Sequence, residues 1–279
     1  IRMNQEAKGP REVILSEFSV TATENVLLYA ALSSYPVRVK IADYDYQVQE
    51  LVAFLKKMGV RIRTPEFHTL HIEGAKKLKG ARHKLMADPI EAGTLILLGA
   101  AAKGGITVEN VELAYLHLFL KKLRDAGIPL DVSQKGGKGA VQVQHVKNPK
   151  IAAIQSWIYP GVHSDLQSTF GVLATQSRGS TLLHDPLYEG RLKYLEELNR
   201  MGAEIYFADP HRAIINGPTK LYGTDLGTFD LRGGAALIIA SLIAEGKSTI
   251  SNIYQIDRGY EKIEERLQNL GADITRIQD

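Results

Sequence analysis

Cysteine is absent from all 279 residues, which excludes disulfide bonds, thiolate metal ligands and a cysteine nucleophile within the chain. Long apolar runs are lacking too: Leu95–Ala102 is the most apolar stretch, far short of the roughly 20 residues that a membrane helix needs. The 34 basic and 31 acidic residues form no block of like charge that would indicate a nucleic-acid partner. We therefore expect a soluble, cytoplasmic protein that binds neither membrane nor nucleic acid.

The chain begins with Ile1, and its opening residues lack the basic start and apolar core of a signal peptide. We interpret it as truncated, with a missing N-terminal segment that would hold part of the chemistry. A net charge of +3 and 44% hydrophobic residues are ordinary for one large or two smaller folded domains.

Four copies of one pattern follow each other along the chain. Each copy opens with a short polar segment, continues through a helical stretch rich in small residues and a β-like run, and then reaches an amphipathic helix. A glycine suits the left-handed position behind a helix, where a Cβ would be strained. Such glycines end the four amphipathic helices about 70 residues apart, at Gly59, Gly127, Gly202 and Gly271.

Two alternating runs follow the glycine, as in Val60–Arg63 and Thr69–Ile72, and alternation with period 2 predicts strands. The predicted unit is therefore βαβαββ. Residues 1–18 resemble the closing strands of an earlier unit, and the last unit stops after a strand at Ile274–Ile277. We expect an α/β (α+β) fold in which residues 1–87 end a first domain, with the end of one unit plus one full unit. Residues 88–279 would form a second domain of three units, the last one incomplete.

Several strings resemble the enolpyruvyl transferase family and occur in the family's order over essentially the whole chain. The most specific is Tyr254–Glu261, which is similar to the C-terminal signature of members acting on UDP-N-acetylglucosamine. The others are Ser19–Thr23, Ile90–Thr94, Tyr159–Gln167 and Asp230–Arg232. The resemblance implies two inside-out α/β barrel domains, each of three units, closing over a cleft. It also implies that the N-terminal strand of the complete protein returns to finish the second domain.

By this resemblance the substrates are phosphoenolpyruvate and UDP-N-acetylglucosamine, whose 3-hydroxyl receives the enolpyruvyl group by addition and then elimination of phosphate. This would be the first committed step of peptidoglycan synthesis. The reaction needs a carboxylate base, cations for the carboxylate and phosphate, and an acid for the methylene carbon, and it implies no metal or organic cofactor. The family's acid, a cysteine or aspartate on a mobile loop, would precede Ile1, so we expect these residues alone to be inactive.

Asp165 stands before an uncharged helical stretch. It could simply cap that helix, because an aspartate oxygen readily accepts first-turn amide protons. The resemblance implies instead that Asp165 is the general base, and both roles could coexist. His163-Ser164 precedes Asp165, where the family usually has Pro-Thr.

Three arginines lie beside or within helical segments of their units, and any one of them alone would usually be a solvated helix residue. A guanidinium can hold a carboxylate or phosphate through paired hydrogen bonds. The resemblance implies that Arg191 and Arg232 grip the phosphoenolpyruvate carboxylate and that Arg258 helps to hold the phosphate. Asp230, near Arg232, could orient the guanidinium, cap a helix or balance charge, and we rank orientation first.

Ser19-Val20-Thr21 begins a helix, whose N-terminal amides could bind the UDP diphosphate, although Ser19 could equally be an ordinary cap. Glu17 stands where the family usually has a basic residue and would repel a diphosphate. Leu187 would by its position pack near the uridine or sugar, and is otherwise a core residue.

Asp43 and Asp45 are interpreted as surface or hinge residues without assigned chemistry. His68 and His71 lie in a strand-like segment that sends them to opposite faces, so no metal site is predicted.

Three alternative functions stay open. The Gln255–Glu261 string argues against the sister transferase acting on shikimate 3-phosphate, which typically has a lysine near this point. A non-catalytic sugar-nucleotide-binding homologue would be favoured if the natural gene began near Ile1. An RNA-cyclase-type protein fits poorly with the near-neutral charge.

Overall fold

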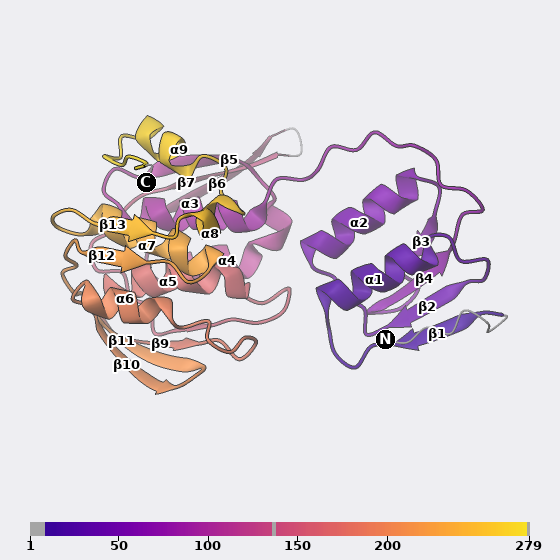
Figure 1. The fold of residues 1–279 in the computed structure, drawn as a ribbon, viewed down its shortest axis with the longest axis horizontal. Coiled ribbons are helices and arrows are strands. Elements are labelled where there is room, and N and C mark those ends of the chain that lie inside the picture. Colours follow the sequence, from indigo (N-terminus) through magenta and orange to yellow (C-terminus); the bar gives the residue numbers. More distant parts are fainter. Residues whose placement is uncertain (1–8, 136–137, 278–279) are drawn as a thin grey trace. The chain divides into compact units, whose positions relative to one another are not determined.

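The computed structural model describes residues 9–135 and 138–277. The chain divides into two compact units, with the boundary between Met86 and Ala87. Figure 1 shows both units. Within the described residues, no helix has the length and apolar character needed to cross a membrane.

The first unit is a four-stranded sheet with two helices on one face (Figure 1). β1 pairs in parallel with β2, and the remaining neighbours in the order β1-β2-β4-β3 are antiparallel. Leu27, Val39 and Ile72 lie in the apolar core between helices and sheet. The unit is a complete βαβαββ, as the alternation predicted. Its elements are β1 (Arg11–Ile14), α1 (Val20–Ala30), β2 (Val37–Lys40), α2 (Tyr46–Lys57), β3 (Arg61–Arg63) and β4 (Thr69–Glu73).

The interpretation of residues 1–18 as the end of an earlier unit is wrong for β1. This strand pairs in parallel with β2 from Arg11↔Val37 to Ile14↔Lys40, so it begins this unit. Alternating side chains identify a strand but carry no information about its partner, which is why the sequence misplaced it. Residues 1–8 lie outside the described residues.

The second unit holds three further copies of the repeat, whose bounds are as follows. The first copy contains α3 (Pro89–Ala101), β5 (Ile106–Val111), the 3₁₀ turn η1 (Leu113–Tyr115), α4 (His117–Asp125), β6 (Leu130–Lys135) and β7 (Lys138–Val143). The second contains β8 (Ala153–Gln155), α5 (Ser164–Thr175), β9 (Gly179–His184), α6 (Tyr194–Arg200), β10 (Glu204–Asp209) and β11 (Arg212–Gly217). The third contains β12 (Asp225–Gly227), α7 (Leu231–Ile243), β13 (Thr249–Ser251), α8 (Tyr254–Asp257) and α9 (Ile263–Asn269).

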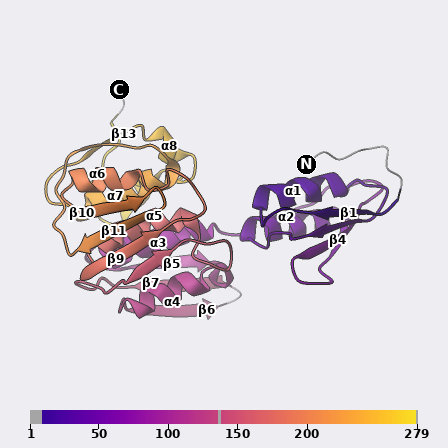
Figure 2. The same ribbon diagram turned by 90° about the horizontal axis from the view of Figure 1, so that it is seen from below.

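The first long helix of each copy lies at the centre of the second unit. These helices, α3, α5 and α7, pack against one another, and the sheets lie outside them (Figure 2). Nearly every residue of α3 and α5 is buried, as expected for helices that are apolar on all sides. Helices inside and strands outside give the inside-out α/β arrangement, which confirms the predicted fold class.

Only the middle copy of this unit has four paired strands among the described residues, in the order β10-β11-β9-β8. The strand expected at Ile274–Ile277 is not formed. In both complete copies the third strand pairs with the fourth, β3 with β4 and β10 with β11. Among the described residues the third copy contains no fourth strand, and the segment at Ile274–Ile277 pairs with none of the strands.

The four glycines behind the amphipathic helices adopt the left-handed conformation, with φ between 82° and 103°. At Gly59 the backbone N–H donates to the Lys56 carbonyl, and that of Val60 donates to the Leu55 carbonyl, both at 3.1 Å. These two bonds define a Schellman motif, and the other three helices end with the same pair. The glycines therefore end helices, as predicted.

Candidate active site

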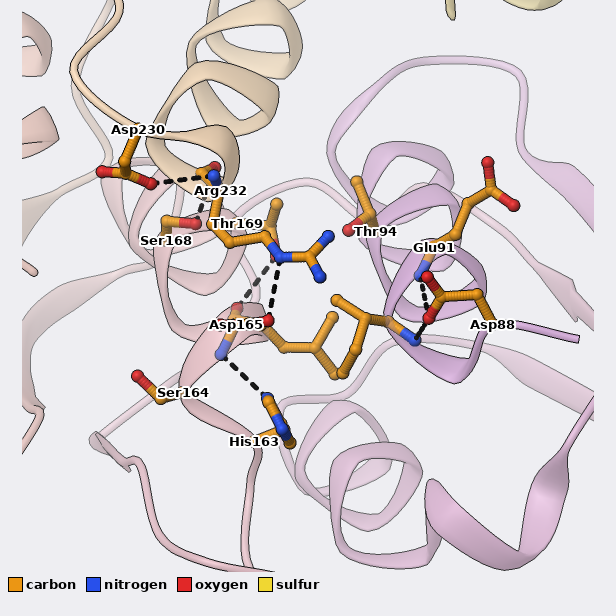
Figure 3. A network of polar contacts seen from close by, with 12 residues as sticks. Asp88, Glu91, Thr94, His163, Ser164, Asp165, Ser168, Thr169, Asp230 and Arg232 are labelled. Atoms are coloured by element: carbon orange, nitrogen blue, oxygen red, sulfur yellow. Dashed lines mark hydrogen bonds and ion pairs between the residues drawn. The ribbon is translucent and has the colours of Figure 1, made fainter. Parts of the chain in front are cut away.

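The first turns of α5 and α7 converge on one carboxylate, Asp165 (Figure 3). His163 is the residue that caps α5, because its Nδ1 accepts the Asp165 backbone N–H at 3.1 Å. Asp165 is the second residue of the helix, so the sequence interpretation of Asp165 as a cap is wrong. Since His163 takes the capping role, the Asp165 carboxylate is available for other contacts.

Both oxygens of Asp165 bind arginines. Arg191, in the turn before α6, donates from Nη2 to Oδ1 at 2.5 Å, and Arg232, the second residue of α7, donates from Nε to Oδ2 at 2.9 Å. The side chains of Asp165, Arg191 and Arg232 are only 21%, 18% and 11% exposed. The structure thus brings together three of the residues that the sequence singled out.

Charge decides the protonation of Asp165. Burial alone raises its pKa, but the positive charges of Arg232 and Arg191 outweigh that effect and hold the pKa below its ordinary value. The N-terminal end of α5 adds a favourable dipole beside a first-turn carboxylate. Asp165 is therefore ionised at neutral pH, as a base must be.

A second set of contacts also holds Arg232 in place. Its Nη1 donates to the Tyr260 hydroxyl at 3.3 Å, and its guanidinium lies 5.6 Å from the centre of the Tyr260 ring. That hydroxyl also hydrogen-bonds Thr94 Oγ1 of α3 at 2.8 Å, and Ser168 of α5 donates to the Arg232 carbonyl. Figure 3 shows Arg232 reaching from α7 into the space between α5 and α3. All three central helices thus contribute to the site.

Arg191 has its own support. Its Nε donates to Ser164 Oγ at 3.1 Å, and its guanidinium lies 4.9 Å from the centre of the Tyr188 ring. Ser164 Oγ in turn donates to Oδ2 of Asp185, a fully buried carboxylate at the end of β9. The two arginines are therefore held by different groups, and each binds a different oxygen of Asp165.

Two predicted site residues have other roles in this structure. Asp230 caps α7: its Oδ1 accepts the backbone N–H groups of Arg232 and Gly233, both at 2.8 Å. The first-ranked interpretation, that Asp230 orients the guanidinium, is replaced by the capping role. Arg258 is exposed at the end of α8 and donates to Gln255 at 3.0 Å, and no hydrogen bond joins it to Asp165 among the residues that the structure covers.

Leu187 lies half-buried in the turn after β9, where its backbone N–H donates to Asp185 Oδ1 at 3.1 Å. This places it two residues from the buried carboxylate that supports Arg191. Its proposed contact with the uridine or sugar stays a prediction.

The remaining predicted residues belong to the first unit. Ser19 caps α1 by accepting the Ala22 N–H at 3.3 Å, and Val20 and Thr21 form the helix's first turn. The expectation that Asp43 and Asp45 lie at the surface is wrong, because each is 5% exposed. They are buried because their polar atoms are used locally: Asp43 Oδ1 accepts the Asp45 N–H, and Asp45 caps α2.

Sequence reasoning missed four residues of this cluster, namely Thr94, Ser164, Asp185 and Tyr260. Thr94, Ser164 and Tyr260 lie inside the strings that carried the family resemblance, so a signal was present without a role. Asp185 lies in none of them. An aspartate followed by proline at a strand end is an ordinary turn signal, and nothing local marks it as part of a site.

Residues 1–267 match the family model described as EPSP synthase (3-phosphoshikimate 1-carboxyvinyltransferase). Among the curated relatives, UDP-N-acetylglucosamine 1-carboxyvinyltransferase of Bacteroides thetaiotaomicron is 39% identical over 274 residues, which cover 95% of this chain and 63% of the relative. UDP-N-acetylglucosamine 1-carboxyvinyltransferase 1 of Caldanaerobacter subterraneus is 37% identical, with the same coverage of each chain. The chain thus spans about 63% of the length of these relatives.

Solved structures give the same fold. The enolpyruvyl transferase NikO from Streptomyces tendae matches with a TM-score of 0.87 at 23% identity, covering 95% of this chain and 65% of that one. EPSP synthase from Acinetobacter baumannii matches with a TM-score of 0.76 at 17% identity, covering 96% and 63%.

Proposed function

Since the chain belongs to the EPSP synthase family of enolpyruvyl transferases, we propose that the complete protein transfers the enolpyruvyl group of phosphoenolpyruvate to the 3-hydroxyl of UDP-N-acetylglucosamine. Phosphate is released, and the step commits the sugar nucleotide to peptidoglycan synthesis. The names of relatives at 37 to 39% identity support this choice of acceptor. The observation that carries the chemistry is the half-buried, ionised Asp165 between two arginines.

Asp165 is the proposed general base. It accepts the proton of the sugar hydroxyl while the hydroxyl oxygen bonds to the C2 carbon of phosphoenolpyruvate, and an acid protonates the methylene carbon. Loss of a proton from the resulting methyl group and departure of phosphate then restore the double bond in the product. The acid would come from a segment outside these residues, so we expect this chain alone to be inactive.

Arg191 and Arg232 are the proposed ligands of the phosphoenolpyruvate carboxylate. Both now bind Asp165, so an incoming carboxylate would compete with Asp165 for the same donors. Arg232 can share its donors, because its Nη1 and Nε already bind different partners. A substrate carboxylate that takes over part of these bonds would leave an Asp165 oxygen free to accept the hydroxyl proton.

The remaining predicted residues are proposed to hold the other parts of the two substrates. Ser19, Val20 and Thr21 would bind the diphosphate, Leu187 would contact the uridine or sugar, and Arg258 would hold the phosphate. Arg258 is exposed and donates a local hydrogen bond to Gln255, a contact that an incoming phosphate would replace. A strand from a segment outside these residues would pair with β13, as β11 pairs with β9 in the complete copy.

Calorimetric titration of UDP-N-acetylglucosamine into the complete protein, followed by phosphate release on adding phosphoenolpyruvate, tests the proposal. Binding together with release is the expected result. Binding without release would favour a non-catalytic sugar-nucleotide-binding homologue. If there is no binding, release with shikimate 3-phosphate as acceptor would identify the sister transferase.

A further inference from the structure

Asp185 is a carboxylate enclosed by the protein, with 0% of the residue exposed. A buried carboxylate is costly unless its oxygens are hydrogen-bonded. Three donors meet this need: Ser164 Oγ at 2.5 Å on Oδ2, and the backbone N–H groups of Leu187 at 3.1 Å and Tyr188 at 3.3 Å on Oδ1. Oδ1 therefore accepts hydrogen bonds from the turn at Leu187 and Tyr188, and Oδ2 accepts one from Ser164.

The contact with Ser164 fixes the direction of a hydrogen-bond chain. A serine hydroxyl has one proton, and here that proton is donated to Asp185. The lone pairs of Ser164 Oγ then face Arg191, whose Nε donates to them at 3.1 Å. With Nε held in this way, Nη2 of Arg191 donates to Asp165 at 2.5 Å.

We propose that Asp185 is a positioning residue: by fixing the Ser164 hydroxyl as an acceptor, it sets the guanidinium of Arg191 against Asp165. The inference rests on the proposed function, because Arg191 matters for turnover only if it binds phosphoenolpyruvate and holds the base. Asp185 itself touches neither Asp165 nor Arg191 in the described residues, and it acts through Ser164.

The isosteric variant Asp185→Asn reverses this chain without removing the turn. The backbone N–H groups of Leu187 and Tyr188 require an acceptor, so the asparagine oxygen stays on their side. The amide nitrogen then faces Ser164 and donates to it. Ser164 Oγ has lone pairs for both this amide and Arg191 Nε, but its own proton loses the Asp185 acceptor that fixed its direction. The hydroxyl can then rotate its proton toward Arg191, which would place two donors opposite each other.

The kinetic test uses the complete protein and compares Asp185→Asn, Ser164→Ala and the double variant with the wild type. We expect each single variant to raise KM for phosphoenolpyruvate or lower kcat by roughly 10-fold, with affinity for UDP-N-acetylglucosamine unchanged. The double variant should be no worse than either single one, because both break the same chain. Ser164→Thr keeps a hydroxyl and should restore most of the activity lost in Ser164→Ala.

Asp125→Asn is the matched control. Asp125 is also a carboxylate paired with a cation, Lys121 at 2.5 Å, but it lies exposed in the last turn of α4. Its kinetics should equal those of the wild type. Losses that add up in the double variant, or lowered thermal stability with unchanged kinetics, would mean that Asp185 only supports the fold.

A crystal structure of the complete Asp185→Asn protein gives a readout that needs no activity. We expect the Arg191 Nε to Ser164 Oγ distance to lengthen beyond about 3.5 Å, while the turn at Leu187 keeps its place. An unchanged contact would overturn the positioning role even if the wild type proved inactive. Wild-type inactivity with the expected displacement would overturn the proposed function and leave the positioning role standing.

Discussion

Replacing Asp165 by asparagine in the complete protein tests the general base most directly. Asparagine keeps the shape of the side chain but removes the group that accepts the hydroxyl proton, and general-base catalysis is worth about 100-fold or more. A 100-fold loss of turnover corresponds to about 2.7 kcal/mol of transition-state stabilisation. Because Leu187 and the residues of the first unit are untouched, we expect affinity for UDP-N-acetylglucosamine to stay nearly the same.

The same change has a structural cost that can be worked from the contacts. Asp165 accepts one hydrogen bond on each oxygen, from Arg191 and from Arg232. In asparagine one of those atoms becomes a donor, so one arginine, 18% or 11% exposed, faces a donor and loses its charged acceptor. A lost hydrogen bond between charged groups predicts about 1–3 kcal/mol of destabilisation. The variant should therefore melt earlier but still fold.

Phosphate release under saturating substrates measures turnover, and calorimetry measures binding of the sugar nucleotide. Asp125→Asn serves as the control, since it removes an exposed carboxylate paired with Lys121 in the last turn of α4 and should leave turnover unchanged. Wild-type turnover in a folded Asp165→Asn protein would refute the assignment of the base. Loss of sugar-nucleotide binding would instead mean that Asp165 acts mainly in binding.

Three further outcomes follow from the contacts. Arg232→Lys keeps the charge but cannot bind Asp165 and Tyr260 together, so KM for phosphoenolpyruvate should rise about 10-fold or more in steady-state kinetics. Burial raises the pKa of Asp165, but the arginines hold it below the unfolded value, so its stabilising effect is full above about pH 4 and is lost as the pH falls through the folded pKa. The difference in urea midpoint between wild type and Asp165→Asn should therefore be constant above about pH 4 and shrink below it, and a difference that stays constant on acidification would contradict this. Gly59→Ala should lower the free energy of unfolding in urea by about 1 kcal/mol, because φ at this position is 103°. Gly80 has equal space for a Cβ but no positive φ, so Gly80→Ala should lower it less, and equal losses would contradict the helix-ending role of Gly59.

The repeat was accessible from sequence because local rules govern it. The Schellman glycines, the alternation in β4 and the apolar stripes each reflect the physics of one element, and the structure contains all of them. Strand partners were less accessible. β1 and the segment at Ile274–Ile277 both carry strand-like patterns, yet pairing depends on which neighbour is present. One segment therefore joined a different unit from the one expected, and the other formed no strand.

The candidate site was also only partly predictable from the sequence. Asp165, Arg191 and Arg232 were found from the resemblance, and the structure brings them together. Asp230 illustrates what sequence could not decide: its neighbour Arg232 is two residues along, so orientation of the guanidinium and capping of the helix were both reasonable. Where the helix begins settles the matter, and helix starts are among the least certain features of a sequence prediction.

The shifted start of α5 has a consequence for how such a site can arise. In the neighbouring copy the aspartate of the Asp-Leu pair caps the helix, as Asp230 does, whereas in α5 the helix begins earlier and His163 takes over the cap. Equivalent aspartates in a repeat can therefore all cap helices. A shift of the helix start by two residues frees one of these aspartates from capping. A repeated protein can gain a reactive carboxylate in this way while its other copies continue to maintain the scaffold.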